Sequence, residues 1–463
     1  MTRDRRHSRL RWVAPLLTLA LVAAVAATGW RLGWVDEWLD PAPAVAPVTE
    51  PPAPWEAPVP SPAAVVADAG TTAPDPGLVT AALAPALADG DLGGHVVAEV
   101  APVEGGAPVF ETGQGAAVPA SLTKLLTSTA ALETLGPERT FKTTVVQPDP
   151  GTVVLVGGGD PLLASRPHQD LWPPPADLRT LARATATALK KQGVDRVALG
   201  YDDSLFAGPT HSGHWPASYA TENVVAPITA LWVDRGYAKN GRSEADPSRA
   251  AADLFRTYLG RRGITVTGDP APTTGAGDTL AEVESPPLRE IVQHLLSTSD
   301  NEVAEVVGRQ VGVAAGDPTF EGAAAAILRA DSQVGVPVDG VELYDASGLA
   351  RDNRITPEAL TAVLQHASQP GFDAILTGLP VAGFSGSLIA RFTDDASSAG
   401  LGVARLKTGT LTGVHGVAGL VTDADGTVMT LVVMADAVAA DRSLAARRAL
   451  DDAAAALAGC HCS

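Results

Sequence analysis

Three short motifs place hydroxyl and amine side chains where they could react together. Ser121 and Lys124 form an S-x-x-K motif at the start of an expected helix. Residues three apart lie on one helix face, so the hydroxyl and the amine can come within hydrogen-bonding distance. The helix N-terminus disfavours a protonated amine and favours an oxyanion. The pair could therefore act as nucleophile and base, and a chance placement on the surface is the alternative.

The other two motifs carry similar side chains. Ser299-Asp300-Asn301 follows an apolar run, and its alternative role is a simple N-cap of the next helix. Lys407-Thr408-Gly409-Thr410 closes an expected strand, where Gly409 would let a ligand approach the backbone. A lysine exposed at a strand end is the alternative for this motif.

Lysine is rare in this chain. The sequence has six lysines, and two of them, Lys124 and Lys407, lie in these motifs. Only lysine readily loses its proton when buried, since arginine stays charged. The placement therefore favours a chemical role for both amines.

The pKa shift that a lysine needs in order to act as a base is of a size that a nearby charge and burial can supply. A lysine base must lower its pKa from about 10.4 to roughly 7 or 8, which corresponds to about 3 to 4 kcal/mol. A second ammonium about 4 Å away contributes roughly 4 kcal/mol at an effective dielectric constant of 20. We expect Lys407 to supply most of the pKa shift of Lys124, with burial adding more.

The elements that must position these motifs begin near residue 78. Two strands, at 95–103 and 108–112, precede a helix at 121–134 that Leu135-Gly136-Pro137 should stop. Residues 141–277 change character, with short β-like runs between Gly- and Pro-rich turns and a helix at 247–262. We interpret this stretch as an inserted accessory region.

Helical patterns return at 287–311 and 323–334. Three consecutive strands follow, at 401–407, 414–423 and 428–435, with Asp425-Gly426 as the second turn. A final Ala-rich helix covers 442–457. Strands at both ends with helices between them predict an α/β fold in which one antiparallel sheet lies between helices.

The N-terminal residues resemble a targeting segment and a tether. Residues 1–11 are rich in arginine, and 12–30 form an apolar run. The positive end should stay in the cytoplasm and the remainder should be exported. The length fits a membrane anchor, and Ala24-Val25-Ala26 resembles a cleavage site, so both forms remain open. Residues 31–77, rich in Pro and Ala, predict an extended tether or a plain linker.

Net charge and cysteine content argue against a nucleic-acid-binding protein and against a disulfide-linked fold. A net charge of -19 makes nucleic-acid binding a poor hypothesis, because phosphate contacts need clustered Lys and Arg. The only cysteines, Cys460 and Cys462, lie in the last four residues, so no disulfide framework links the fold. With His461 between them they could bind a metal, or they could belong to a disordered tail. No H-E-x-x-H pattern occurs, and we expect no metal or cofactor.

Taken together, the motifs resemble a known family. S-x-x-K, S-D-N and K-T-G in this order are the signature of penicillin-recognising serine enzymes. Further segments resemble the class C, low-molecular-mass penicillin-binding proteins, the D-alanyl-D-alanine carboxypeptidase/endopeptidase family. These segments are Val156 to Pro161 (V-G-G-G-D-P), Asp202 to Phe206 (D-D-S-L-F), Asp345 to Asn353 (D-A-S-G-L-A-R-D-N), Leu379 to Gly383 (L-P-V-A-G) and Arg405 to Leu411 (R-L-K-T-G-T-L).

The resemblance implies a catalytic role for each motif. Ser121 Oγ would attack the carbonyl between two terminal D-alanines, and neutral Lys124 would take its proton. Ser299 would relay a proton to the departing amine, and Asn301 would hold the peptide amide and Lys124. Water would then cleave the acyl-enzyme.

The resemblance also implies how substrate is bound. Lys407 would supply positive charge, and the hydroxyls of Thr408 and Thr410, beside Gly409, would hold the terminal carboxylate. The N–H groups of Ser121 and Thr410 would form the oxyanion hole. Arg351 would contact the stem peptide, and a structural salt bridge is its alternative role.

The same resemblance implies the organisation and the partners. Residues 78–140 and 278–459 would form a serine DD-peptidase domain, with 141–277 inserted and 460–463 as a tail. Its partners would be peptidoglycan peptides ending in D-Ala-D-Ala, β-lactams as inhibitors, and the membrane through the N-terminal segment. The protein would act in the cell envelope, anchored or secreted, as a carboxypeptidase and possibly also an endopeptidase.

Two rival functions share these motifs. A β-lactamase of this type has a short spacing between the first two motifs and an E-x-x-L-N loop, which we do not find. A non-catalytic wall-binding protein could keep the fold, although all three motifs are intact here.

Overall fold

The computed structural model describes residues 73–463. Within this range, residues 73–260 and 264–463 belong to one compact unit. The expected apolar segment at 12–30 and most of the tether lie outside the described residues. Among residues 73–463, no helix is both long and apolar enough to cross a membrane.

A five-stranded antiparallel sheet joins the two ends of the described chain. Its strand order is β2-β1-β10-β9-β8, so the first and the last strands of the sequence are direct neighbours. Each strand pairs antiparallel with the next, as the sequence predicted. The strands are β1 (Val96–Pro102), β2 (Phe110–Thr112), β8 (Ala404–Leu411), β9 (Val414–Thr422) and β10 (Val428–Ala435).

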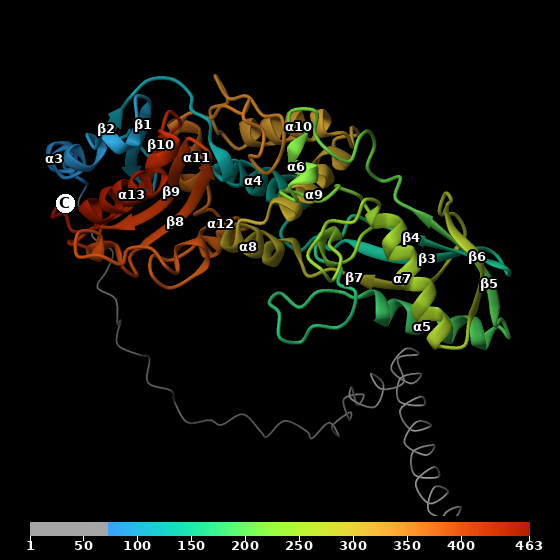
Figure 1. Cartoon of the computed structure of the whole chain (residues 1–463). Coiled ribbons are helices and arrows are strands. Elements are labelled where there is room, and N and C mark those ends of the chain that lie inside the picture. Colours follow the sequence, from blue (N-terminus) through green and yellow to red (C-terminus); the bar gives the residue numbers. More distant parts are fainter. Residues whose placement is uncertain (1–72) are drawn as a thin grey trace, which may run out of the picture. The chain divides into compact units, whose positions relative to one another are not determined.

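Helices cover both faces of this sheet (Figure 1). Because side chains alternate along a strand, Val417 and Val433 point into one apolar cluster while Ala418 and Val432 point into another. The predicted α/β fold, with an antiparallel sheet between helices, is confirmed. On the first face lie α13 (Ser443–Ala458) and α3 (Pro76–Leu87), and on the second lie α4 (Thr123–Leu135) and α11 (Pro357–His366).

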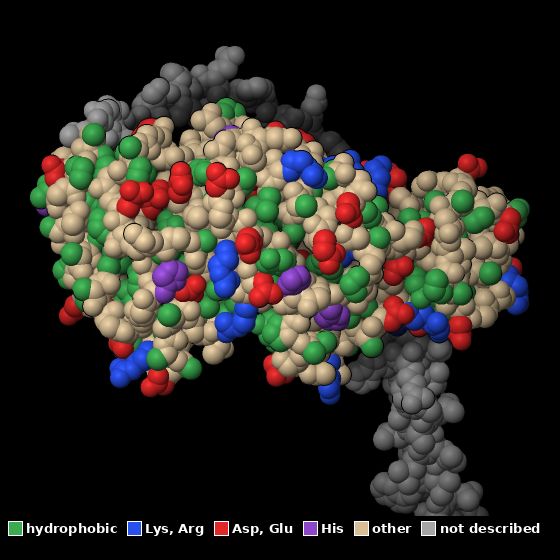
Figure 2. All heavy atoms as spheres, turned by 90° about the horizontal axis from the view of Figure 1, so that it is seen from above, with side chains coloured by type: hydrophobic (Ala, Val, Ile, Leu, Met, Phe, Trp, Pro, Cys, Tyr) green, Lys and Arg blue, Asp and Glu red, His purple; other side chains and the backbone are tan. Residues whose placement is uncertain are grey.

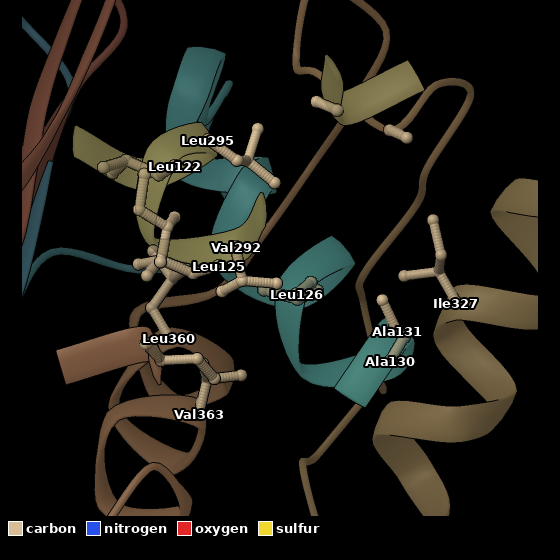
Figure 3. Close-up of a cluster of buried hydrophobic side chains, with 14 of the residues drawn as sticks. Leu122, Leu125, Leu126, Ala130, Ala131, Val292, Leu295, Ile327, Leu360 and Val363 are labelled. Carbon is tan, nitrogen blue, oxygen red and sulfur yellow. The ribbon is translucent and has the colours of Figure 1, made fainter. Parts of the chain in front are cut away.

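A core of leucine, valine and alanine side chains fixes the helix that follows Ser121. Figure 3 shows Leu122, Leu125 and Leu126 packed among Val292 and other side chains from neighbouring helices. Each such buried side chain contributes about 1.5–3 kcal/mol relative to an exposed one. The surrounding helices are α8 (Leu288–Thr298), α9 (Asn301–Ala314), α10 (Phe320–Gln333) and α12 (Asp373–Gly378).

Two helix boundaries differ from the expected ones. A 3₁₀ turn at Ala120–Leu122 precedes α4, so the helix proper begins two residues after Ser121. The helix expected at 287–311 is two helices, because Ser299 adopts a left-handed conformation and ends α8. Asp300 then caps α9, with its side chain accepting a hydrogen bond from Val303 N.

A second five-stranded sheet has the order β6-β5-β4-β3-β7 and mixes parallel and antiparallel pairs. α5 (Leu178–Lys191) and α7 (Pro247–Arg261) contribute to its apolar core. Its edge strand β7 lies wholly beyond the expected inserted range of 141–277. The strands are β3 (Lys142–Asp149), β4 (Thr152–Val156), β5 (Arg196–Asp202), β6 (Thr265–Pro272) and β7 (Asp278–Glu284).

The C-terminal tail is ordered, which corrects both expectations for it. Cys460 and Cys462 form a disulfide bond, so they are neither free thiols for a metal nor part of a disordered end. The carbonyl of Cys462 accepts a hydrogen bond from Asp75 N, and that of Cys460 accepts one from Ala424 N. The tail thus joins the start of α3 to the turn between β9 and β10. The disulfide closes a loop with one intervening residue and links no distant elements.

Close packing in the sheet gives a first prediction. A Cβ added at Gly419 would lie 2.0 Å from Arg405 O, so β8 would have to move. We expect Gly419→Ala to destabilise the fold by more than about 2 kcal/mol. Gly90→Ala is the control, since its Cβ would meet no atom within 4 Å. Thermal unfolding measures both, and an unchanged midpoint for Gly419→Ala would contradict the packing described.

Candidate active site

Ser121 is held by an unusually close approach of three chain segments. Its neighbour Ala120 has a positive φ of 48°, which is rare for a residue other than glycine. A Cβ at Gly348 would lie 1.8 Å from Ala120 O, and one at Gly409 would lie 2.5 Å from Pro119 O. The close approach that we expected Gly409 to offer a ligand is therefore made by the protein's own backbone.

Lys124 lies beside Ser121 with its amine enclosed by acceptors. Its Nζ is 2.9 Å from Ser121 Oγ, 2.7 Å from Asn301 Oδ1 and 2.6 Å from Ser347 O. The side chain is fully buried. A neutral amine has two protons, and donating them to the amide and carbonyl oxygens leaves its lone pair for the Ser121 hydroxyl. The contacts thus orient Lys124 to accept the proton of Ser121.

Burial is the main reason that Lys124 can be neutral. It lowers the pKa of Lys124 to about 8, while the negative charge of Asp345, and that of Glu305 when it is ionised, acts in the opposite direction. Our expectation that Lys407 would supply most of this shift was wrong. The charge interaction between the two lysines instead contributes to lowering the pKa of Lys407.

Lys407 joins the K-T-G motif to the S-D-N motif. Its Nζ donates to Ser299 Oγ at 2.7 Å and to Thr408 O at 2.8 Å. The side chain is fully buried, and burial, followed by the charge of Lys124, lowers its pKa well below the usual value. Lys407 does not close its strand as expected, because β8 continues to Leu411.

β8 is the edge strand of its sheet, and its outer side is only partly covered. Leu406 N donates to Pro380 O, so the backbone groups of alternate residues, including Thr408 and Thr410, face away from β9. Thr410 is exposed, and Thr408 Oγ1 is 2.9 Å from Ser387 Oγ. The Thr410 N–H is therefore directed toward the open edge, where a peptide could lie.

The structure brings most of the expected residues together and leaves one at the margin. Direct side-chain contacts link Ser121 to Lys124, Lys124 to Asn301, and Lys407 to Ser299. Arg351 is exposed and donates to Thr412 O in the turn between β8 and β9. This contact is not the alternative salt bridge, and a contact of Arg351 with the stem peptide stays a prediction.

Two buried carboxyl groups, to which the sequence alone assigned no role, hold the segment that carries Ser347. Glu305 accepts hydrogen bonds from Ala346 N and Ser347 N, and burial raises its pKa to about 8. Asp345 accepts from Gly348 N and from three further donors. An acidic residue between the apolar Val303-Ala304 and Val306-Val307 was the available signal for Glu305.

A loop of the second sheet's region fixes the S-D-N segment from outside. Arg235 Nη1 lies 2.5 Å from Asp300 Oδ2, and Tyr237 donates to Glu302 Oε1 at 2.5 Å. The Asp300 side chain is 2% exposed, so Arg235 compensates a nearly buried charge. No pattern in the sequence indicated these partners, because they lie about 65 positions apart.

On the face shown in Figure 2, Lys and Arg side chains are scattered among acidic ones without a continuous basic surface. Residues 73–463 contain no group of three or more His, Cys, Asp or Glu side chains suited to hold a metal ion.

The match to a family decides which chemistry these contacts serve. The profile of the D-Ala-D-Ala carboxypeptidase 3 (S13) family matches residues 79–241 and 238–457. The chain belongs to this family. The predicted activity, that of a serine-type D-Ala-D-Ala carboxypeptidase, is confirmed at this level, as is the predicted resemblance.

Relatives of this S13 carboxypeptidase cover almost its whole length. Carboxypeptidase DacB of Mycolicibacterium smegmatis is 36% identical over 432 residues, which span 88% of this chain and 91% of the relative. A carboxypeptidase of Mycobacterium tuberculosis is also 36% identical, over 86% of this chain and 87% of its own. Penicillin-binding protein 4 of Haemophilus influenzae shares the fold, with a TM-score of 0.65, 19% identity, and coverage of 80% of this chain and 97% of its own.

The buried Glu305 of this carboxypeptidase generates a second prediction. With a pKa of about 8 it is largely uncharged at neutral pH, and a glutamine keeps an oxygen acceptor for the two N–H groups. We expect Glu305→Gln to keep the rate of acylation by penicillin within about threefold. Glu305→Leu leaves two buried N–H groups unpaired, at about 1–3 kcal/mol each, and should lower that rate by more than tenfold. Equal rates for the two variants would contradict a role for Glu305 in holding Ser347.

Proposed function

We propose that this S13 carboxypeptidase removes the terminal D-alanine from peptidoglycan stem peptides through an acyl-enzyme on Ser121. The observation that carries the proposal is the enclosure of Lys124, whose amine contacts Ser121 Oγ and whose pKa is lowered to about 8. A nucleophile and a base in contact, with the base near its working pKa, are what acyl transfer requires.

In the first half of the reaction the peptide bond is broken. Ser121 Oγ attacks the carbonyl carbon of the penultimate residue while Lys124 takes the hydroxyl proton. The N–H groups of Ser121 and Thr410 stabilise the oxyanion, a contribution of about 3 to 4 kcal/mol per donor. Ser299, which contacts Lys407, passes its proton to the leaving amine and is reprotonated by the proton that Lys124 took, so Lys124 is neutral again when free D-alanine departs. Water then hydrolyses the ester and returns the proton to Ser121.

Recognition of the terminal carboxylate is assigned to β8. Thr408 and Thr410 offer hydroxyl donors, and the open strand edge can pair with an extended peptide. Burial and the charge of Lys124 both disfavour the ammonium form of Lys407. A bound carboxylate would favour the ammonium form of Lys407, so substrate binding itself would supply the charge partner.

The proposed location rests on the N-terminal sequence, and the proposed inhibitors rest on a solved structure of similar fold. The arginine-rich residues 1–11 and the apolar run at 12–30 favour export, with the catalytic region in the cell envelope, anchored or released. Penicillin-binding protein 4 of Haemophilus influenzae, 20% identical, has been solved in complex with a β-lactam. We propose the same class of ligand for Ser121 of this chain. Cross-linked stems would react by the same steps with a larger leaving amine.

The proposed function is tested by measuring D-alanine release and penicillin labelling on the same enzyme. Purified enzyme should release D-alanine from a peptide ending in D-Ala-D-Ala and should bind fluorescent penicillin. Ser121→Ala should lose both, by more than about 10³-fold, whereas Ser332→Ala, an exposed serine on α10, should keep both. Persistent labelling of Ser121→Ala would refute the assignment.

Product patterns separate the remaining alternatives. A digest of purified peptidoglycan distinguishes D-alanine release from conversion of cross-linked dimers to monomers. Penicillin turnover within seconds would favour a β-lactamase. Absence of release and labelling in the unaltered chain would favour a non-catalytic wall-binding protein.

The pKa of Lys124 generates a prediction on pH. Below a pKa of about 8 the amine is mostly protonated and cannot take the Ser121 proton. We expect the acylation rate constant to rise about tenfold per pH unit below pH 7 and to level off above about pH 8. Stopped-flow labelling with a fluorescent penicillin measures the profile. A rate that falls over this range would contradict a neutral Lys124 as base.

A further inference from the structure

We propose that Ser387 is a positioning residue for recognition of the substrate's terminal carboxylate, and that it acts through Thr408. The inference rests on the proposed function, because it presumes that Thr408 binds this carboxylate. Ser387 belongs to the segment G-F-S-G-S at 383–387, which leads into a 3₁₀ turn.

The segment that carries Ser387 is fixed between two of the catalytic motifs. Its backbone pairs with the outer edge of β8, through Leu406 N to Pro380 O and Ala382 N to Ala404 O, both at 2.9 Å. On the other side a Cβ at Gly386 would lie 2.4 Å from Ser297 O, two residues before Ser299. The 3₁₀ turn Gly386–Leu388 therefore contacts both α8 and β8.

Within this turn Leu388 is fully buried, whereas Ser387 is exposed at the site. Ser387 Oγ lies 2.9 Å from Thr408 Oγ1, and either hydroxyl could donate. This is the single hydrogen bond of the Ser387 side chain within the described part of the chain. Among residues 73–463 the Ser387 hydroxyl therefore has no hydrogen-bond partner other than Thr408.

A bound carboxylate would decide the direction of this hydrogen bond. Thr408 has one hydroxyl proton, and a carboxylate only accepts hydrogen bonds. If Thr408 donates to the carboxylate, its oxygen is free to accept from Ser387. The two consecutive hydrogen bonds, from Ser387 to Thr408 and from Thr408 to the carboxylate, are cooperative, because each bond polarises the next. Ser387 thus orients the Thr408 proton and strengthens it as a donor without touching the substrate.

Two thioester substrates isolate this effect. One is an N-acyl-D-alanyl thioester of thioglycolic acid, whose leaving group carries a carboxylate, and the other is its methyl ester. We expect Ser387→Ala to lower kcat/KM for the acid about 5- to 10-fold, mainly through KM, and to leave the methyl ester within twofold. Ser387→Thr, which keeps the hydroxyl, should restore kcat/KM for the acid. Ile389→Ala, an exposed neighbour at 64% exposure, controls for disturbance of the segment.

A double-mutant cycle tests whether Ser387 acts through Thr408. Thr408→Val should lower kcat/KM for the acid, and adding Ser387→Ala should lower it no further. Additive losses, equal losses on acid and ester, or no loss in Ser387→Ala would each overturn the inference. An unaltered enzyme that does not prefer the acid to the ester would overturn it as well.

Failure of the inference is distinguishable from failure of the proposed function. Penicillin labelling that depends on Ser121 reports on the proposed function, and it should persist in every Ser387 variant. If only the role of Ser387 is wrong, the labelling that depends on Ser121 remains intact.

Discussion

The burial of two lysine amines is the constraint on which the catalytic centre depends. Removing an ammonium from water is costly, so a buried lysine loses its proton or gains partners. Lys124 and Lys407 are both fully buried, and each amine is surrounded by oxygen acceptors. The same burial that provides a base near neutral pH therefore requires that several chain segments converge with their oxygen atoms correctly placed.

The unusual backbone around the site follows from this requirement. Ser299 has a positive φ of 59°, and this lets one residue end α8 while its hydroxyl reaches Lys407. Gly348 also has a positive φ, and it lies against Ala120 where a side chain could not fit. Such conformations cost of order 1–3 kcal/mol each for residues other than glycine and persist where the surrounding packing fixes them. Here the leucine core beneath α4 supplies that packing.

Local pattern and motif order were sufficient to predict much of this arrangement. The antiparallel strands at both ends and the contact between Ser121 and Lys124 followed from alternation and helical spacing. The cause of the lowered Lys124 pKa could not be predicted from the sequence. Burial is a property of the packed fold, and the distance between two lysines in space is not given by their spacing in the sequence. Glu305 and Ser387 were missed for a related reason, since each acts through a partner that lies far away in the sequence. The order of the tail also depends on such a partner, Asp75 at the other end of the described chain.

The carboxyl groups around Lys124 explain how one site can hold two amines in different states. Burial alone would lower both pKa values strongly. For Lys124 the acidic groups of Asp345, Glu305, Asp300 and Glu302 oppose burial to the extent that they are ionised, and its pKa remains at about 8. Burial and the charge of Lys124 both lower the pKa of Lys407. A general base works best when its pKa is near the operating pH, so the acidic residues keep Lys124 in a useful range. Lys407 remains the amine that gains most from an anionic ligand, and this difference separates the roles of base and carboxylate partner.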